Sequence, residues 1–255
     1  MEWLIVCSAA FAASLFTLFS GFGLGTLLMP VIALFFPLDL AIAMTALVHL
    51  ANNLFKFMLL GRQANLWLLW QFGLPAVLAA LLGAWFLSQL GAQPAWYQYT
   101  IFGQHFDIMP IKLVIGVLIM VFVLLELSPR FAAVQLPPQW LPLGGFISGF
   151  FGGLSGHQGA LRSLFLRKTG LDKNALVATT VVLAVMVDLA RMAVYGAKLP
   201  LQQVQWPLVL AACAAAFSGA YLGKKMLQKV TLLAVQRLIS IMLLLLALAL
   251  IAGWV

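Results

Sequence analysis

Apolar residues fill most of the chain, in blocks separated by short polar stretches. Most blocks are about 20 residues long, which is the length at which an α-helix crosses the hydrocarbon of a bilayer. The pattern therefore predicts membrane-spanning helices rather than surface helices with a single apolar face. The blocks cover approximately residues 3–36, 41–60, 66–90, 111–127, 139–166, 174–196, 205–223 and 234–254.

Two of the blocks are interrupted by glycine and polar residues, at Gly21–Thr26 and at Gly152–Arg162. Broken backbone at membrane depth is tolerated only inside protein or along a polar cavity, because hydrocarbon offers no hydrogen-bond partners. Two broken apolar segments in matching halves are typical of a binding site near the midplane of a transporter.

The chain also repeats itself. Gly83-Ala84-Trp85 corresponds to Gly219-Ala220-Tyr221, and Thr45-Ala46-Leu47-Val48 corresponds to Thr179-Thr180-Val181-Val182. The predicted fold is therefore an all-α polytopic membrane protein with two inverted repeats. Each repeat has one broken or re-entrant segment and three transmembrane helices, and the predicted domains are residues 1–128 and 139–255.

Composition agrees with a membrane protein, because 64% of the residues are hydrophobic and only 8% are charged. Trp3–Phe19 has no basic region before it, so we interpret it as a retained segment rather than a cleaved signal. Cys7 and Cys213 indicate neither a disulfide framework nor a metal site, and no cofactor is expected. The net charge of +8 is assigned to loops rather than to nucleic-acid binding.

The basic residues test the topology. If the broken blocks return to the side from which they start, almost every Lys and Arg falls on one face, and both termini lie on the other. That arrangement predicts periplasmic termini. The residues on the shared face are Lys56, Arg62, Arg130, Arg167, Lys168, Lys173, Lys224, Lys225, Lys229 and Arg237, and only Lys112 and Lys198 lie opposite.

The second break is a candidate anion site. Free N–H groups at the start of a helix carry partial positive charge, and Arg162 lies one turn inside that helix. The alternative is that the glycines permit close packing and that Arg162 pairs with Asp188 for structural reasons. The predicted substrate-binding residues of the two breaks are Gly23, Gly25, Thr26, Ser155, Gly156, His157, Gln158, Gly159 and Arg162.

A polar stripe follows the first break, at Thr45, His49, Asn52, Asn53 and Lys56. His49 and Asn53 are candidate substrate ligands, although an interhelical hydrogen-bond seam explains them equally well. Lys56 is expected to extend to the cytoplasmic surface.

In the comparable helix of the second half, Arg191 is expected near the outer surface. Asp188 could neutralise Arg162, relay a proton or form a structural ion pair. The proton-coupling candidates are His49, His157 and Asp188.

An intramembrane serine protease is a weaker interpretation of His49, Asn53 and Gly153-Leu154-Ser155-Gly156. It needs a general base on a later helix, but the last histidine is His157, only two residues beyond Ser155. We therefore expect no enzyme activity.

With these residues in view, the chain resembles the sulfite exporter family (TauE/SafE), also called the toluene-sulfonate uptake permease family. The resemblance covers nearly the whole chain and rests on the breaks Gly21–Pro30 and Gly156–Leu164 with the helices that follow them. It implies transport of small sulfur-containing or carboxylate anions across the bacterial inner membrane, driven by protons. Leu164 stands where the first half has Pro30, and this departure leaves the substrate open.

The leading hypothesis is a proton-coupled secondary transporter whose partners are a small anion, protons and the lipid bilayer. A passive anion channel that uses the same breaks remains the main alternative. No nucleic-acid partner is expected, and a homo-oligomer is left open.

Overall fold

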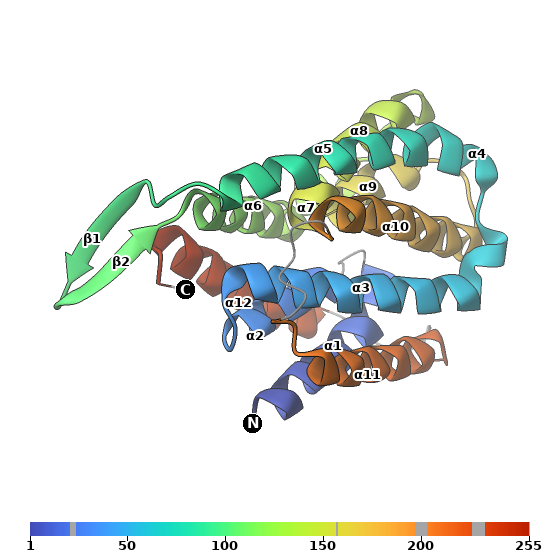
Figure 1. The fold of residues 1–255 in the computed structure, drawn as a ribbon. Coiled ribbons are helices and arrows are strands. Elements are labelled where there is room, and N and C mark those ends of the chain that lie inside the picture. Colours follow the sequence, from blue (N-terminus) through green and yellow to red (C-terminus); the bar gives the residue numbers. More distant parts are fainter. Residues whose placement is uncertain (21–23, 157, 197–202, 226–232, 255) are drawn as a thin grey trace.

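The computed structural model describes residues 1–20, 24–156, 158–196, 203–225 and 233–254. Helices run alongside one another in a bundle, and a β-hairpin extends from one end of it (Figure 1). Several helical segments are long and apolar enough to cross a membrane, so the predicted all-α polytopic fold is confirmed. These segments are Leu40–Leu59, Leu66–Gly91, Pro110–Leu127, Lys173–Val194 and Trp206–Lys225.

In the first half, the long opening block is divided between α1 and α2, as the glycine cluster predicts. The segment containing α4 and α5 is one continuous span that includes a π-helical stretch. The elements are α1 (Glu2–Ser20), α2 (Leu24–Ala33), α3 (Leu38–Leu60), η1 (Gly61–Gln63), α4 (Leu66–Leu68), η2 (Leu69–Gly73), α5 (Leu74–Gly91) and α6 (Pro110–Leu127).

The second half repeats this order of one broken segment followed by three longer helices. Its broken segment consists of α8 and α9, which are separated at the second glycine cluster. The elements, with the connection before them, are α7 (Pro129–Ala133), η3 (Pro138–Trp140), α8 (Leu141–Ser155), α9 (Gly159–Leu166), α10 (Lys173–Tyr195), α11 (Trp206–Lys225) and α12 (Leu233–Ala252).

Residues 97–108 form a hairpin that the sequence analysis did not predict. Strand β1 (Tyr97–Ile101) pairs antiparallel with β2 (Gln104–Ile108). The Tyr99 hydroxyl donates to the Ala252 carbonyl at 2.5 Å and accepts from Trp254 Nε1 at 3.0 Å. The hairpin is therefore attached to the end of α12.

The second broken segment enters the bundle and returns to the end from which it started. The Leu136 N–H, just before η3, donates to the Leu164 carbonyl near the end of α9 at 3.0 Å. A Cβ on Gly144, in the first turn of α8, would lie 2.3 Å from the Phe165 ring. The start of α8 and the end of α9 are therefore neighbours, which is the predicted re-entrant arrangement.

Both chain ends lie at the end of the bundle that carries the hairpin (Figure 1). We call this the termini end. The connection from α3 to α4, the start of α10 and the last turn of α11 lie at the opposite end (Figure 1). We call that the basic end, because it carries Arg62, Lys173, Lys224 and Lys225.

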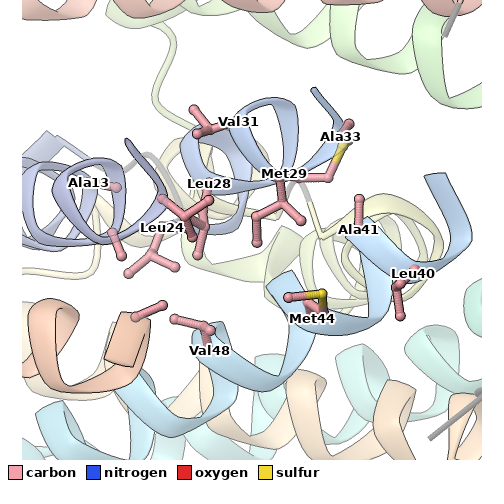
Figure 2. Close-up of a cluster of buried hydrophobic side chains, with 14 of the residues drawn as sticks. Ala13, Leu24, Leu28, Met29, Val31, Ala33, Leu40, Ala41, Met44 and Val48 are labelled. Atoms are coloured by element: carbon pink, nitrogen blue, oxygen red, sulfur yellow. The ribbon is translucent and has the colours of Figure 1, made fainter. Parts of the chain in front are cut away.

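Helix α2 lies inside the protein, between α1 and α3 (Figure 2). Leu24 and Leu28 of α2 form one buried cluster with Ala13 of α1 and with Met44 and Val48 of α3. Helix α2 is therefore buried between its neighbours along this face, as its depth in the membrane requires.

Backbone-to-backbone contact joins the two halves. Gly149 and Gly153 of α8 pack on the Ala76 and Ala80 carbonyls of α5, and a Cβ at either glycine would lie only 2.1 Å from the oxygen. Small residues allow this approach, which strengthens van der Waals contact between helices in a membrane.

The packing partners are exchanged between the halves. Gly83 of α5 lies against the Phe150 carbonyl of α8, and Gly219 of α11 lies against the Phe11 carbonyl of α1. Each half thus packs its second long span on the broken segment of the other half. Gly83 and Gly219 are the residues that the sequence repeat aligns, so this packing supports the predicted inverted repeats.

Candidate functional site

A buried polar cluster joins α3 to α10 at the middle of both helices. His49 Nδ1 lies 2.7 Å from Asp188 Oδ2, and Asn53 Nδ2 donates to the same oxygen at 2.7 Å. Nδ1 faces a carboxylate and therefore carries the proton in this contact. His49 Nδ1 also lies 3.2 Å from Asn53 Nδ2. Both nitrogens are then donors to the same acceptor, Asp188 Oδ2.

Arg191 completes this cluster from one turn further along α10. Its Nη2 lies 3.0 Å from Asp188 Oδ1 and 3.5 Å from His49 Nδ1. Only 5% of Arg191 is exposed, and Asp188 is fully buried. The expectation that Arg191 lies near the outer surface was therefore wrong, because the residue is held inside as the counter-ion of Asp188.

The second break reaches the same cluster. Helix α8 ends at Ser155, and Gly156 follows in the left-handed conformation with φ of 80°. A Cβ at Gly156 would lie 2.8 Å from Arg191 Nη1, so a larger residue would be strained and would also displace the guanidinium. Glycine is required here by backbone conformation and by the close approach of Arg191.

Arg162 and Gln158 lie just beyond that break, in and before the first turn of α9. Arg162 Nη1 donates to Gln158 Oε1 at 3.3 Å, and both side chains are buried. The Gln158 carbonyl accepts from Ser148 Oγ at 3.0 Å, which fixes the backbone at this turn. Gln158 Nε2 has no hydrogen-bond partner among the described residues.

The first break approaches the cluster through α2. A Cβ at Gly25 would lie 3.5 Å from His49 Cδ2 and 3.6 Å from Thr45 Cγ2. Thr45 Oγ1 is buried without a partner among the described residues. Gly25 therefore lies against His49, which in turn contacts Asn53.

The buried cations exceed the carboxylates that neutralise them. The buried ion pairs of this cluster are His49–Asp188 and Arg191–Asp188. Asp188 acts on Arg162 electrostatically, but the two groups are not within ion-pair distance. The Arg162–Asp188 ion pair of the structural alternative is therefore absent from the described contacts. The printed side-chain partner of Arg162 among the described residues is the Gln158 amide oxygen.

The family model of the sulfite exporter TauE/SafE matches residues 6–250. The chain belongs to this family. No curated protein and no solved structure matches it. The TauE/SafE family is a family of transporters, and this agrees with the membrane fold of the chain.

The TauE/SafE match does not identify which residues bind the substrate, so each prediction is compared here with the fold. Gly156, Gln158, Gly159 and Arg162 lie together at the second break. Gly23 and His157 lie outside the described residues, and Thr26 is described only as part of the backbone of α2.

Ser155 lies in the last turn of α8, where its hydroxyl donates to the Phe151 carbonyl at 3.1 Å. This bond to its own helix leaves the hydroxyl oriented along α8.

Lys56 does not extend to the surface as expected, because only 5% of it is exposed. Helix α11 packs on α3 on this side, and Ser14 of α1 contacts Asn52 one turn before Lys56. The sequence analysis judged depth from the distance to the helix end and therefore missed this covering.

Proposed function

We propose that this protein is a proton-coupled secondary transporter that moves a small anion, such as sulfite or an organosulfonate, through the centre of the bundle. The observation that supports this most directly is the excess of buried positive charge. Buried charges normally have a partner of opposite sign. Arg162 has none within ion-pair distance among the described residues, so an anionic substrate would supply the missing charge.

The second break offers the donors that such an anion requires. Helix α9 directs the free N–H groups of its first turn toward the break, where negative charge is stabilised. Gln158 Nε2 is buried with an unused donor at the same turn. A guanidinium can add two parallel hydrogen bonds to a sulfonate, sulfite or carboxylate.

The cluster on α3 and α10 is placed to couple protons to this movement. His49 is in contact with Asp188, which is shared with Arg191 and Asn53. A change in the protonation of His49 would alter the charge beside both breaks. That change would favour or oppose an anion bound next to Arg162, which is the physical basis of coupling.

The test is sulfite binding by purified protein with alanine at Arg162. Losing one partner of a buried charged pair costs about 2–5 kcal/mol, so Arg162→Ala should weaken binding by roughly 30-fold or more. Arg162→Lys should recover only part, since an ammonium cannot form the planar fork.

Arg62→Ala is the matched control, because Arg62 is an exposed arginine in η1. Normal sulfite affinity in a folded Arg162→Ala variant would show that Arg162 is structural. Accumulation of sulfite against its gradient in proteoliposomes would separate the transporter from a passive channel, which can only equalise concentrations.

A further inference from the structure

A second polar cluster lies beside the central one, on the flank of α3 that meets α1 and α11. It joins Ser14 of α1, Asn52 and Lys56 of α3 and the Ala216 carbonyl of α11, and all of these residues are buried. Asn52 Nδ2 donates to Ser14 Oγ at 2.9 Å and to the Ala216 carbonyl at 3.3 Å when its amide is oriented to satisfy both atoms. In that orientation Asn52 Oδ1 accepts from Lys56 Nζ at 3.1 Å.

No carboxylate side chain neutralises Lys56. The chain has six acidic residues, and none of those whose side chains are described forms an ion pair with Lys56. The acidic side chain left undescribed is that of Asp39, which lies on the same helix. At 1.5 Å per residue it is about 25 Å away along the axis, too far for any contact.

Helix α3 and helix α10 both contain 23 residues, and aligning them end to end relates this cation to the central site. Asn53 then corresponds to Asp188, and Lys56 corresponds to Arg191. The first pair meets directly, since Asn53 Nδ2 donates to Asp188 Oδ2 at 2.7 Å. Each cation lies three residues further along its own helix.

The two helices run in opposite directions along the bundle (Figure 1). Lys56 therefore lies one turn from Asn53 in the direction of the basic end. Arg191 lies one turn from Asp188 in the direction of the termini end. The difference is in their partners. Asp188 neutralises Arg191, whereas the corresponding Asn53 is a neutral amide and leaves the charge of Lys56 in place.

We propose that Lys56, Asn52 and Ser14 form a second site for a small oxyanion, between the central cluster and the basic end. The ligand class rests on the proposed function, because the transported anion is the ligand that would pass this point. A buried ammonium supported only by neutral groups is costly, and an apolar residue of similar size would pack at least as well. A compact ammonium with three donors also suits a site that holds an anion briefly, since it lacks the fork that binds one tightly.

The experiment measures sulfite transport in proteoliposomes, with the half-saturating sulfite concentration determined separately from each face. Lys56→Gln should raise that concentration about tenfold when sulfite is presented at the basic end and change it little at the termini end. Lys56→Arg should retain most of the affinity because it keeps the charge. Arg62→Gln removes an exposed charge at the same end and should leave both values unchanged.

Equal values for Lys56→Gln and wild type at both faces would overturn the second site while leaving the proposed transport intact. A wild-type protein that moves no sulfite would instead overturn the proposed function, and this site with it. If Lys56→Gln fails to fold, the same transport measurement is made on Lys56→Met, because methionine keeps an apolar stem of similar length. A folded Lys56→Met protein with wild-type values at the basic end would show that Lys56 is structural.

Discussion

Arg191 and Arg162 have similar burial but different partners, and this difference decides what each can do. Arg191 lies 3.0 Å from Asp188, so its charge is balanced inside the protein. Arg162 contacts an amide oxygen at 3.3 Å, which accepts a hydrogen bond but carries no net charge. At the residue scale, the candidate substrate ligand is thus the cation whose charge the protein leaves unbalanced.

Replacing His49 tests whether the central cluster carries the coupling proton. His49→Gln keeps a donor to Asp188 but removes a side chain that can bind and release a proton. We expect sulfite transport by wild-type protein to respond to an imposed pH gradient and the variant to lose that response while still binding sulfite. Rates in proteoliposomes with and without the gradient measure this.

His105→Gln is the matched control, because His105 lies exposed in the hairpin and contacts Thr100. It should respond like wild type. A full pH response in His49→Gln would assign the coupling proton to a different group.

The sequence was sufficient to place His49 and Asn53 on one protein-facing side of α3, because helical spacing gathers the polar residues of a membrane helix there. It did not pair them with Asp188, whose suggested partner was Arg162. It was not sufficient to give the depth of Lys56 and Arg191. Both lie within a few residues of a helix end, where long cations usually extend to the surface. What keeps them inside is packing by helices distant in sequence, and spacing along one helix contains no information on that.

At the scale of elements, the contact between α5 and α8 depends on glycine at positions where backbones meet. Gly149→Ala would place a methyl group 2.1 Å from the Ala76 carbonyl, so the helices would have to separate. Overpacking of this kind typically costs about 1–3 kcal/mol. We expect a clear fall in the unfolding temperature of the protein purified in detergent. Thermal denaturation measures this temperature.

Gly91→Ala is the control for that substitution, since its methyl group would lie 3.4 Å from Ile111 Cδ1, an ordinary contact. It should unfold close to the wild-type temperature. Equal unfolding temperatures for both variants would mean that α5 and α8 can move apart at little cost.

The helices themselves could be predicted from the apolar blocks, but the hairpin was missed. Residues 97–101 read Tyr-Gln-Tyr-Thr-Ile, which alternates aromatic or β-branched residues with polar ones as a strand does. Phe102 and Gly103 then adopt positive φ angles of 51° and 76° in the turn. The signal was present, yet in a chain dominated by long apolar blocks this short polar segment was interpreted as a loop.

For the whole molecule, the exchange of packing partners supports two halves of opposite orientation. Helix α5 packs on the broken segment of the second half, and α11 packs on that of the first. A pair of equivalent contacts of this kind is what inverted repeats in a transporter would produce. The sequence repeat could indicate the two halves, but it could not show which surfaces meet, because those contacts join residues more than a hundred positions apart in some cases.

Labelling of single cysteines tests the orientation of the bundle in the membrane. The native thiols Cys7 and Cys213 are first replaced by alanine. Phe102→Cys then places a thiol at the fully exposed tip of the hairpin, at the termini end, and Gln63→Cys places one in the exposed η1 connection at the basic end.

Positive charge concentrates in cytoplasmic loops, so the basic end should face the cytoplasm. A membrane-impermeant maleimide should therefore label Phe102→Cys in intact cells, and label Gln63→Cys only after permeabilisation. The reverse pattern would place the termini end of the bundle in the cytoplasm. Labelling of both thiols in intact cells would contradict the span Leu66–Gly91, because the two ends of that segment could not then lie on opposite sides of the membrane.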